Sequence, residues 1–437
     1  MAVTLWLLFF GPLAWPLRNL ETFLILIFLY HIAFVSGYLG KIVNSLKPKR
    51  SIENKSDWAE NLFVDKFWIV ILLAFIGCLI SHRNLVHSDS YIPWAFFSEI
   101  KRGILHASEV RTYYASPEFA GKFTGNKYVT ALLLVLSFFK YILLPGMIML
   151  WERLSLPKKI LGTLVVLIPV ASGISISLSS INFAYLFTTF ICLGVLILQT
   201  RSFFILKSRK TFIIGFFILF IFTILNFYQV KTKASFSEVS SGKAVPVRMD
   251  YLREKGVVFK NDQYRVKITA FEDLYEKLSV YLVNGYVGMS ISLDKDFQSA
   301  FGVGHSTFLQ RVFDQHLGLD ISSRTYQQRI STEWDKDIFW HSAYSYFAND
   351  VSFYGVILVM FIFGFYLASI SINAFLYKDF IASLLMPLFG IFILYLPANN
   401  QIFSFIETMI PFWLLSIIYI GMRTDLVRRV RSYKLST

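Results

Sequence analysis

The residues best suited to chemistry lie in one polar stretch in the second half of the chain. There the sequence Phe301-Gly-Val-Gly-His-Ser306 is followed within about forty residues by further His, Arg, Asp and Glu side chains. A guanidinium group can donate two parallel hydrogen bonds to phosphate oxygens, and glycines let backbone amides approach an anion closely. This pattern predicts a diphosphate site. Its predicted ligands are Arg311, Arg324, Arg329, Gly302 and Gly304.

The same stretch offers several groups that could accept a proton. His305 and His341 are the first candidates, and Glu333 and Asp337 follow them. Fixed cations can stabilise a polyanion without a metal ion, and no compact spacing of Asp, Glu and His demands one. We therefore predict neither a metal nor another cofactor.

Each of these features also has a plainer interpretation. Gly302 and Gly304 can simply form a turn, because a lone Gly-x-Gly is a weak signal. Arg324 or Arg329 can equally be a solvated or ion-paired surface residue. Arg111, in a separate polar segment, is the further cation that we would assign to the diphosphate site.

The composition indicates which kind of scaffold must hold these residues. Hydrophobic residues make up 55% of the 437 and charged residues only 16%, and several uncharged runs reach about 20 residues. The sequence therefore predicts an all-α polytopic membrane protein. The net charge of +14 does not predict a nucleic-acid partner here, because the cations gather between the apolar runs and in the polar segments.

About ten transmembrane helices are expected. They cover residues 3–16, 20–40, 67–82, 128–150, 160–179, 183–200, 211–228, 351–373, 380–396 and 403–421. Basic residues fall in alternate connections, which predicts cytoplasmic termini and outward-facing segments at 83–127 and 229–350. The expected organisation is an N-terminal membrane region 1–228, a large outer loop 229–350, three last helices within 351–421, and a basic tail 422–437.

Within the large loop, residues 269–293 are expected to form an amphipathic or interfacial helix, polar at its start and apolar at its end. Between the last two spans lies a short outer turn rich in amide side chains, which is either a plain turn or a site that recognises sugar hydroxyls. The candidates for sugar or lipid contact in these two regions are Asn284, Tyr286, Asn399, Asn400 and Gln401.

Ionisable side chains inside expected spans are functional candidates by default, and Lys140 and Glu407 stand out on that argument. His31 also lies within a span, but it is more simply a hydrogen-bond donor between helices. Either Lys140 and Glu407 are partners, or Lys140 faces a water-filled cleft.

The span pattern, the dominant outer loop before the last three spans, and the motifs Asn284-Gly-Tyr-x-Gly-Met-Ser290 and Phe301-Gly-x-Gly-His-Ser306 together resemble the Wzy-type O-antigen and oligosaccharide repeat-unit polymerases. The resemblance implies a bacterial inner-membrane glycosyltransferase, similar in fold to the GT-C class, with its active site facing the periplasm. Such enzymes transfer the growing glycan from undecaprenyl diphosphate to the next lipid-linked repeat unit. A chain-length regulator of the Wzz type is the implied protein partner, and the bilayer is the implied setting.

Two other functions stay open. An O-antigen ligase, or another polyprenyl-phosphate-dependent glycosyltransferase, would use a similar outer site with a different acceptor. A polysaccharide or lipid transporter without chemistry would instead concentrate ionisable residues inside the spans and would have no need of a long polar loop.

Overall fold

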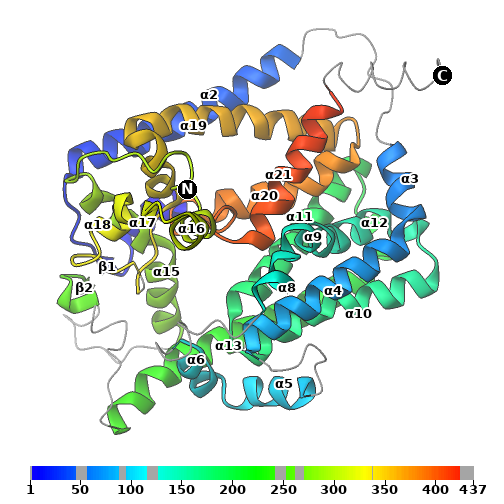
Figure 1. Ribbon diagram of the computed structural model, residues 1–437, viewed down its shortest axis with the longest axis horizontal. Coiled ribbons are helices and arrows are strands. Elements are labelled where there is room, and N and C mark those ends of the chain that lie inside the picture. The colour runs from blue at the N-terminus through cyan, green and yellow to red at the C-terminus, as the bar shows by residue number, and fades with distance from the viewer. Residues whose placement is uncertain are drawn as a thin grey trace. The chain divides into compact units, whose positions relative to one another are not determined.

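The computed structural model describes residues 2–45, 57–87, 95–115, 126–241, 252–260, 270–336 and 338–423. In these residues the regular secondary structure is helical apart from one two-stranded ribbon (Figure 1). It divides into two compact units. Unit 1 contains Met1–Lys47, Lys231–Ser369 and Ile391–Phe405, and unit 2 contains Pro48–Val230, Ile370–Gly390 and Ile406–Thr437. The expected basic tail lies outside the described residues from position 424 onward.

Among the described residues, six helices are long and apolar enough to cross a membrane. These are α2 (Leu20–Ser45), α4 (Phe67–Val86), α9 (Leu133–Leu150), α10 (Leu156–Ser175), α11 (Ser179–Thr200) and α19 (Ala343–Phe375). Three shorter apolar helical stretches are the start of α13 (Lys210–Ser241), α20 (Phe380–Tyr395) and α21 (Ile406–Gly421). Each expected span from residue 20 onward therefore corresponds to an apolar helix, and the prediction of an all-α polytopic membrane protein is confirmed.

The expected first span, residues 3–16, is not a continuous helix. Helix α1 covers only Ala2–Phe10, about 14 Å at 1.5 Å per residue, and so is too short to cross a hydrocarbon core of about 30 Å. Strand β1 (Leu13–Ala14) follows and pairs antiparallel with β2 (Val258–Phe259). Gly11 and Pro12 separate the helix from the strand, and both residue types disfavour helix continuation.

The rest of unit 1 surrounds the polar stretch. Helix α15 (Ala270–Ser292) confirms the helix expected at 269–293. Short helical turns follow at α16 (Thr307–Val312), η3 (Phe313–Leu317), α17 (Ile321–Arg324) and α18 (Tyr326–Arg329). A buried cluster that includes Leu13, Val287 and Trp334 packs the N-terminal strand and α15 against the segment that follows α18.

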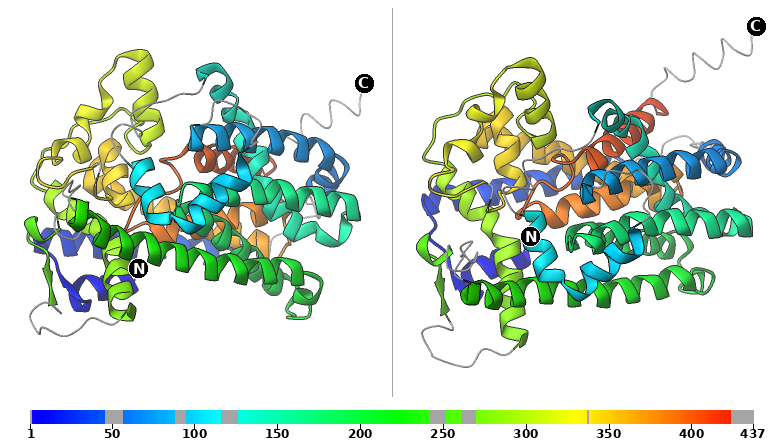
Figure 2. Two further views of the ribbon diagram at one scale, coloured as in Figure 1. Left: turned by 90° about the horizontal axis from the view of Figure 1, so that it is seen from below. Right: turned by 60° about the horizontal axis from the view of Figure 1, so that its bottom comes forward.

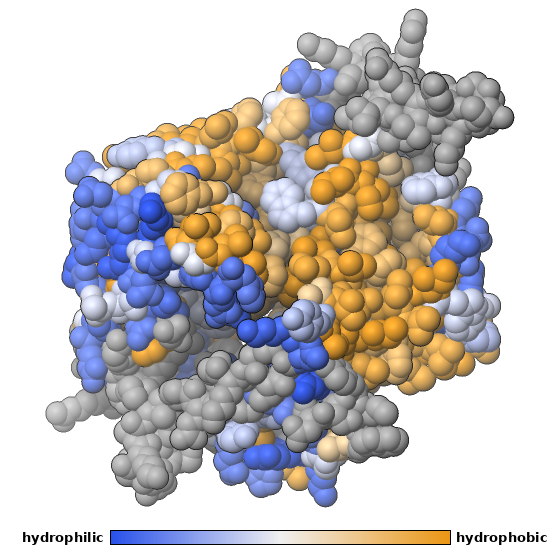
Figure 3. All heavy atoms as spheres, in the orientation of Figure 1, coloured by the Kyte–Doolittle hydropathy of each residue, from blue (hydrophilic) through white to orange (hydrophobic). Residues whose placement is uncertain are grey.

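Unit 2 is a helical bundle in which α4 contacts both α9 and α10 (Figures 1 and 2). Its smaller helices are α3 (Asp57–Asp65), α5 (Phe96–Leu105), α6 (Ala107–Ala115), α8 (Lys127–Ala131), η1 (Trp151–Arg153) and α12 (Ile205–Ser208). Large apolar side chains on α4, such as Trp68, Ile69 and Leu72, are exposed, and the face over this helix is mainly hydrophobic in Figure 3. An exposed apolar face of this kind suits contact with lipid.

Candidate active site

At the centre of the candidate site, the loop that carries Gly304 and His305 binds the carboxylate of Asp350. Asp350 accepts hydrogen bonds from the backbone amides of Gly304 (2.8 Å) and His305 (2.9 Å) and from Nδ1 of the His305 ring (3.0 Å). An ionised carboxylate can only accept, so in the neutral imidazole the ring proton lies on Nδ1. In that tautomer the other ring nitrogen, Nε2, is an acceptor. A carboxylate that orients an imidazole in this way prepares it to act as a general base.

The loop backbone is held rigidly around this pair. The Gly304 carbonyl accepts from Gln310 Nε2 (2.6 Å) and Asn349 Nδ2 (3.0 Å), and the His305 carbonyl accepts from Asn400 Nδ2 (2.5 Å). A side chain at Gly304 would meet the Asn349 Cβ at 2.6 Å, so only glycine fits. The anion that the Gly304 amide binds is therefore Asp350, and that amide is not open to the diphosphate that we predicted for it.

Gly302 has a different reason to be glycine. Its φ of +81° lies in the left-handed region, and a Cβ would meet nothing within 4 Å. Gly302 therefore forms the turn that the plainer interpretation expected.

Asp350 lies in α19, just before a kink in that helix. Ser352 interrupts the helix with φ 62° and ψ 166°, a conformation that costs a non-glycine residue about 1–3 kcal/mol. The Tyr30 hydroxyl on α2 donates to the carbonyl of Phe353 beside this kink (2.7 Å). Asn349 and Asp350 thus lie in the last turn before the break and face the loop that carries His305.

The surroundings of the His305 ring are partly open and aromatic. Its side chain is 17% exposed and that of Asp350 is 10% exposed. Phe347 and Phe403 flank the ring at centroid distances of 6.4 and 5.8 Å. The imidazole can therefore be reached by a ligand, although most of its surface is shielded from water.

The three predicted arginines of this segment differ in exposure and in the contacts that they already make within the protein. Arg311 is exposed at the end of α16. Arg324 is also exposed, and its guanidinium carbon lies 4.8 Å from the centre of the Phe301 ring, four residues before His305. Arg329 donates to the carbonyl of Asp296 (2.5 Å), so it is already engaged within the protein. Arg311 and Arg324 remain the better candidates for binding an anion.

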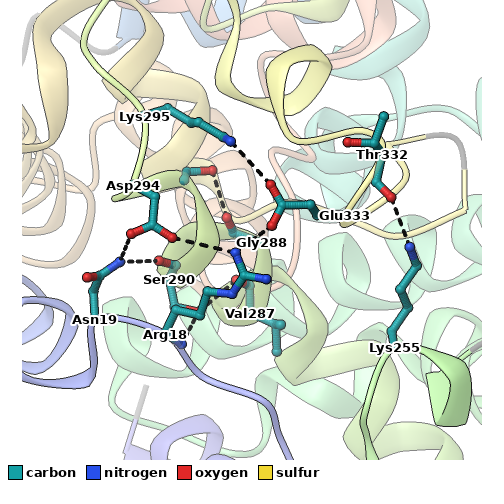
Figure 4. A network of polar contacts seen from close by, with 11 residues as sticks. Arg18, Asn19, Lys255, Val287, Gly288, Ser290, Asp294, Lys295, Thr332 and Glu333 are labelled. Atoms are coloured by element: carbon teal, nitrogen blue, oxygen red, sulfur yellow. Dashed lines mark hydrogen bonds and ion pairs between the residues drawn. The ribbon is translucent and has the colours of Figure 1, made fainter.

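Glu333 is a poor candidate for the base. It accepts from Arg18 (2.5 Å) and lies 3.2 Å from Lys295, and Figure 4 shows this network joining the residues before α2 to the end of α15. Burial acts to raise the pKa of Glu333, but the hydrogen bonds and charges of Lys295 and Arg18 outweigh it and hold the pKa below its usual value. The carboxylate is therefore a weak proton acceptor with a structural role.

His341 is also unsuited to the role predicted for it. Its side chain is fully buried, and burial lowers its pKa to about 3 with help from the charge of Lys336. The imidazole is neutral at physiological pH and out of reach of an acceptor hydroxyl. Asp337, the fourth predicted proton acceptor, lies outside the described residues.

Most of the predicted sugar contacts are occupied by the protein itself. Tyr286 is buried, and its hydroxyl lies 3.2 Å from that of Thr4. Asn399 and Asn400 hold the turn before α21, since each side chain accepts a backbone amide within it. Gln401 is half-buried in the same turn. Asn284 differs from these residues, because it is fully buried and neither of its amide atoms has a hydrogen-bond partner.

Unit 2 contains the remaining candidates. Arg111 is half-buried on α6. Lys140 on α9 forms an ion pair of 2.8 Å with Glu407 on α21, and both contact the hydroxyl of Ser81 on α4. The interpretation of Lys140 and Glu407 as partners is thus confirmed. Among the described residues, no three His, Cys, Asp or Glu side chains lie close enough to hold a metal ion.

Sequence reasoning missed Asp350, the residue that completes the site. The available signal was the polar pair Asn349-Asp350 directly before an apolar run that was expected to span the membrane. Nothing in the sequence linked that pair to a loop forty-five residues earlier. Comparison of the chain with protein-family models, with curated proteins and with solved structures finds no significant match to any of them.

Proposed function

We propose that this chain is a polymerase of lipid-linked oligosaccharide repeat units, in which His305 is the general base and Asp350 orients it. The observation that carries the proposal is the His305–Asp350 pair with Nε2 of the imidazole left as an acceptor. The exposed Arg311 and Arg324 on the same segment, and the membrane-spanning scaffold, support a donor that is a polyprenyl diphosphate.

The proposed reaction is a glycosyl transfer. His305 Nε2 takes the proton from a hydroxyl of the incoming repeat unit, and that oxygen forms a bond to the anomeric carbon of the growing glycan. The bond from that carbon to the phosphate oxygen breaks, and undecaprenyl diphosphate leaves with the electron pair. Arg311 and Arg324 stabilise the negative charge that increases on the diphosphate, which favours the transition state over the ground state.

The proposed setting is the periplasmic face of the bacterial inner membrane, with a Wzz-type regulator as an expected partner. If the nine apolar helices each cross once and the basic C-terminal tail is cytoplasmic, the N-terminus faces the periplasm, unlike the arrangement expected with ten spans. The pairing of β1 with β2 and the contact of Arg18 with Glu333 support this, because residues that touch must share one side of the membrane.

The test is the length distribution of surface polysaccharide in cells deleted for this gene and complemented with variants. We expect the deletion to leave surface lipid bearing a single repeat unit, and wild type to restore the ladder of lengths. His305→Ala should lower the amount of polymer in this ladder by about 10²-fold or more relative to wild type. His316→Ala is the matched control, because His316 is an exposed histidine on the same segment. Membrane levels of each variant must be equal.

Other outcomes favour other functions. If the deletion removes even the single-unit band, a ligase or a flippase is the better assignment. A transport function without chemistry is the second candidate, and the Lys140–Glu407 pair with Ser81 favours it, because ionisable groups inside spans often mark transport pathways. A full ladder from His305→Ala would contradict the assignment of the base.

A further inference from the structure

Three segments of unit 1 meet along one side of α15. The amide of Ser342 approaches the carbonyl of Gly285 at 3.4 Å, and the amide of Ala343 donates to the carbonyl of Leu396 at 2.9 Å. A side chain at Gly285 would collide with the carbonyl of Pro397. The residues before α19 and those after α20 are therefore packed directly against this helix.

Aromatic rings from the three segments gather at this junction. Tyr281 on α15 lies 4.2 Å from Trp340, centre to centre, and both rings lie 6.3 Å from Tyr395. Tyr281 and Trp340 are partly exposed, whereas Tyr395 is buried. Two aromatic faces are thus reachable from solvent, and the third ring closes the cluster from inside.

Polar atoms without partners lie next to these rings. The amide of Asn284 and the ring of His341 are buried; neither polar atom of the amide makes a hydrogen bond, whereas the His341 ring interacts with the backbone of Trp334. A Cβ on Gly288 would lie 2.7 Å from Nδ1 of His341, so this imidazole rests against α15. Residues 281, 284 and 288 share one face of the helix, which places Asn284 between Tyr281 and His341.

Such unpartnered groups are unusual in a folded protein. A buried amide without a partner destabilises the native state unless another molecule satisfies it, and most buried polar groups are satisfied. Neither side chain is charged at physiological pH, since burial lowers the pKa of His341 to about 3. A neutral ligand with several hydroxyls would satisfy Asn284, because an amide can both donate and accept hydrogen bonds.

We propose that Tyr281, Trp340 and Asn284 form a saccharide-binding site, which takes a sugar ring of the glycan that the proposed polymerase elongates. The C–H face of a sugar packs on the partly exposed rings of Tyr281 and Trp340, and one of its hydroxyls binds the Asn284 amide. This inference rests on the proposed function for the identity of the glycan, but sugar binding here does not require polymerase chemistry.

The site differs from the sugar contacts predicted from the amide-rich turn. Asn399 and Asn400 already accept backbone amides there, and Asn400 also holds the loop of His305. Asn284 alone of the predicted amides keeps its full hydrogen-bonding capacity.

The test uses the purified full-length protein in detergent. The probe is a mixture of short oligosaccharides made by partial hydrolysis of the surface polysaccharide of the strain that carries this gene, and binding is followed by tryptophan fluorescence and by calorimetry. We expect Trp340→Ala and Asn284→Leu each to weaken binding about tenfold or more. Tyr286→Phe on the same helix and Trp413→Phe in unit 2 are matched controls that should bind as wild type does.

Thermal unfolding without sugar gives a second measurement. Asn284→Leu should unfold at the same temperature as wild type or higher, because it removes a buried amide that has no partner. A lower unfolding temperature together with unchanged binding would mean that a buried water satisfies Asn284, and would overturn the proposal. Absence of binding to wild type at millimolar probe would also overturn it. If Trp340→Ala weakens binding to the purified protein, this site is supported. If deletion of the gene also leaves the polysaccharide ladder intact, the site is supported but the polymerase function is rejected.

Discussion

Two partly buried carboxylates, one in each unit, are held in different ways. Asp350 in unit 1 is bound by two backbone amides and by an imidazole whose second nitrogen stays open. Glu407 in unit 2 is bound by the Lys140 ammonium and the Ser81 hydroxyl, so its partners are side chains on other helices. Backbone amides bind a carboxylate without requiring a charged side chain. In a side-chain ion pair, by contrast, each charged group is already bound to the other. The first arrangement prepares a base, and the second joins helices.

The largest expected effect is on chemistry in unit 1. Asp350→Asn should lower the turnover of glycan by about 10²- to 10⁴-fold, because an amide stabilises the wrong tautomer of His305 and cannot support the imidazolium. Turnover would be measured as polymer formed by membranes supplied with lipid-linked repeat units. Asp320→Asn, an exposed residue in the same segment but outside the pair, is the control. Equal turnover by Asp350→Asn and wild type would remove the basis of the comparison.

The next effect is on stability in unit 2. Lys140→Met leaves the Glu407 carboxylate without its cation and should lower the free energy of unfolding by about 1–3 kcal/mol, less than for a fully buried pair because the Glu407 side chain is 37% exposed. Thermal unfolding in detergent measures it. The matched control is Lys295→Met, which breaks the more exposed pair with Glu333 and should change stability by under about 1 kcal/mol. Similar losses in both variants would contradict the distinction.

Adding one methyl group tests how tightly the loop in unit 1 is held. In Gly304→Ala the new Cβ would lie 2.5 Å from that of Ala300 and 2.6 Å from that of Asn349, which should cost about 1–3 kcal/mol and reduce turnover together with stability. Gly302→Ala meets no neighbour and should cost about 1 kcal/mol through backbone strain alone. Thermal unfolding of the two variants gives the order of the effects, and the reverse order would show that the loop can relax.

The pH dependence of stability tests the burial of His341. The native pKa of His341 is about 3 and its unfolded value is near 6.5, so between these values the unfolded chain binds a proton that the native chain does not. Stability should therefore fall as the pH falls from about 6.5 toward 3, by at most about 1.4 kcal/mol per pH unit. His341→Gln should flatten this slope in thermal unfolding scans. An unchanged slope would mean that other groups cause the loss.

The smallest effect is expected at the network shown in Figure 4. Arg18→Ala removes a contact of Glu333 but leaves Lys295, and the Arg18 side chain is 53% exposed. The free energy of unfolding should fall by under about 1 kcal/mol, and the difference from wild type should shrink in high salt. Urea or thermal unfolding at two salt concentrations measures this. A loss above 2 kcal/mol would mean that the N-terminal segment depends on this network.

The sequence alone was sufficient for the membrane class, nine of the apolar helices and the segment that carries His305, because each depends on the local pattern of apolar and charged residues. The same pattern misled at residues 3–16, where an apolar composition hid a nine-residue helix followed by a strand. Hydropathy does not register that Gly11 and Pro12 end a helix or that Leu13 pairs with Phe259.

What only the tertiary structure decided is which groups meet. The motif around Gly304 predicted an anion, but the anion is Asp350, which comes from the far end of the segment and lies two residues before a kink at Ser352. Histidines and amides that look equivalent in the sequence were separated in the same way: His305 is open, His341 is buried, Asn400 is occupied and Asn284 is not. Burial and partners depend on contacts between residues far apart in the chain, and local composition carries no information about them.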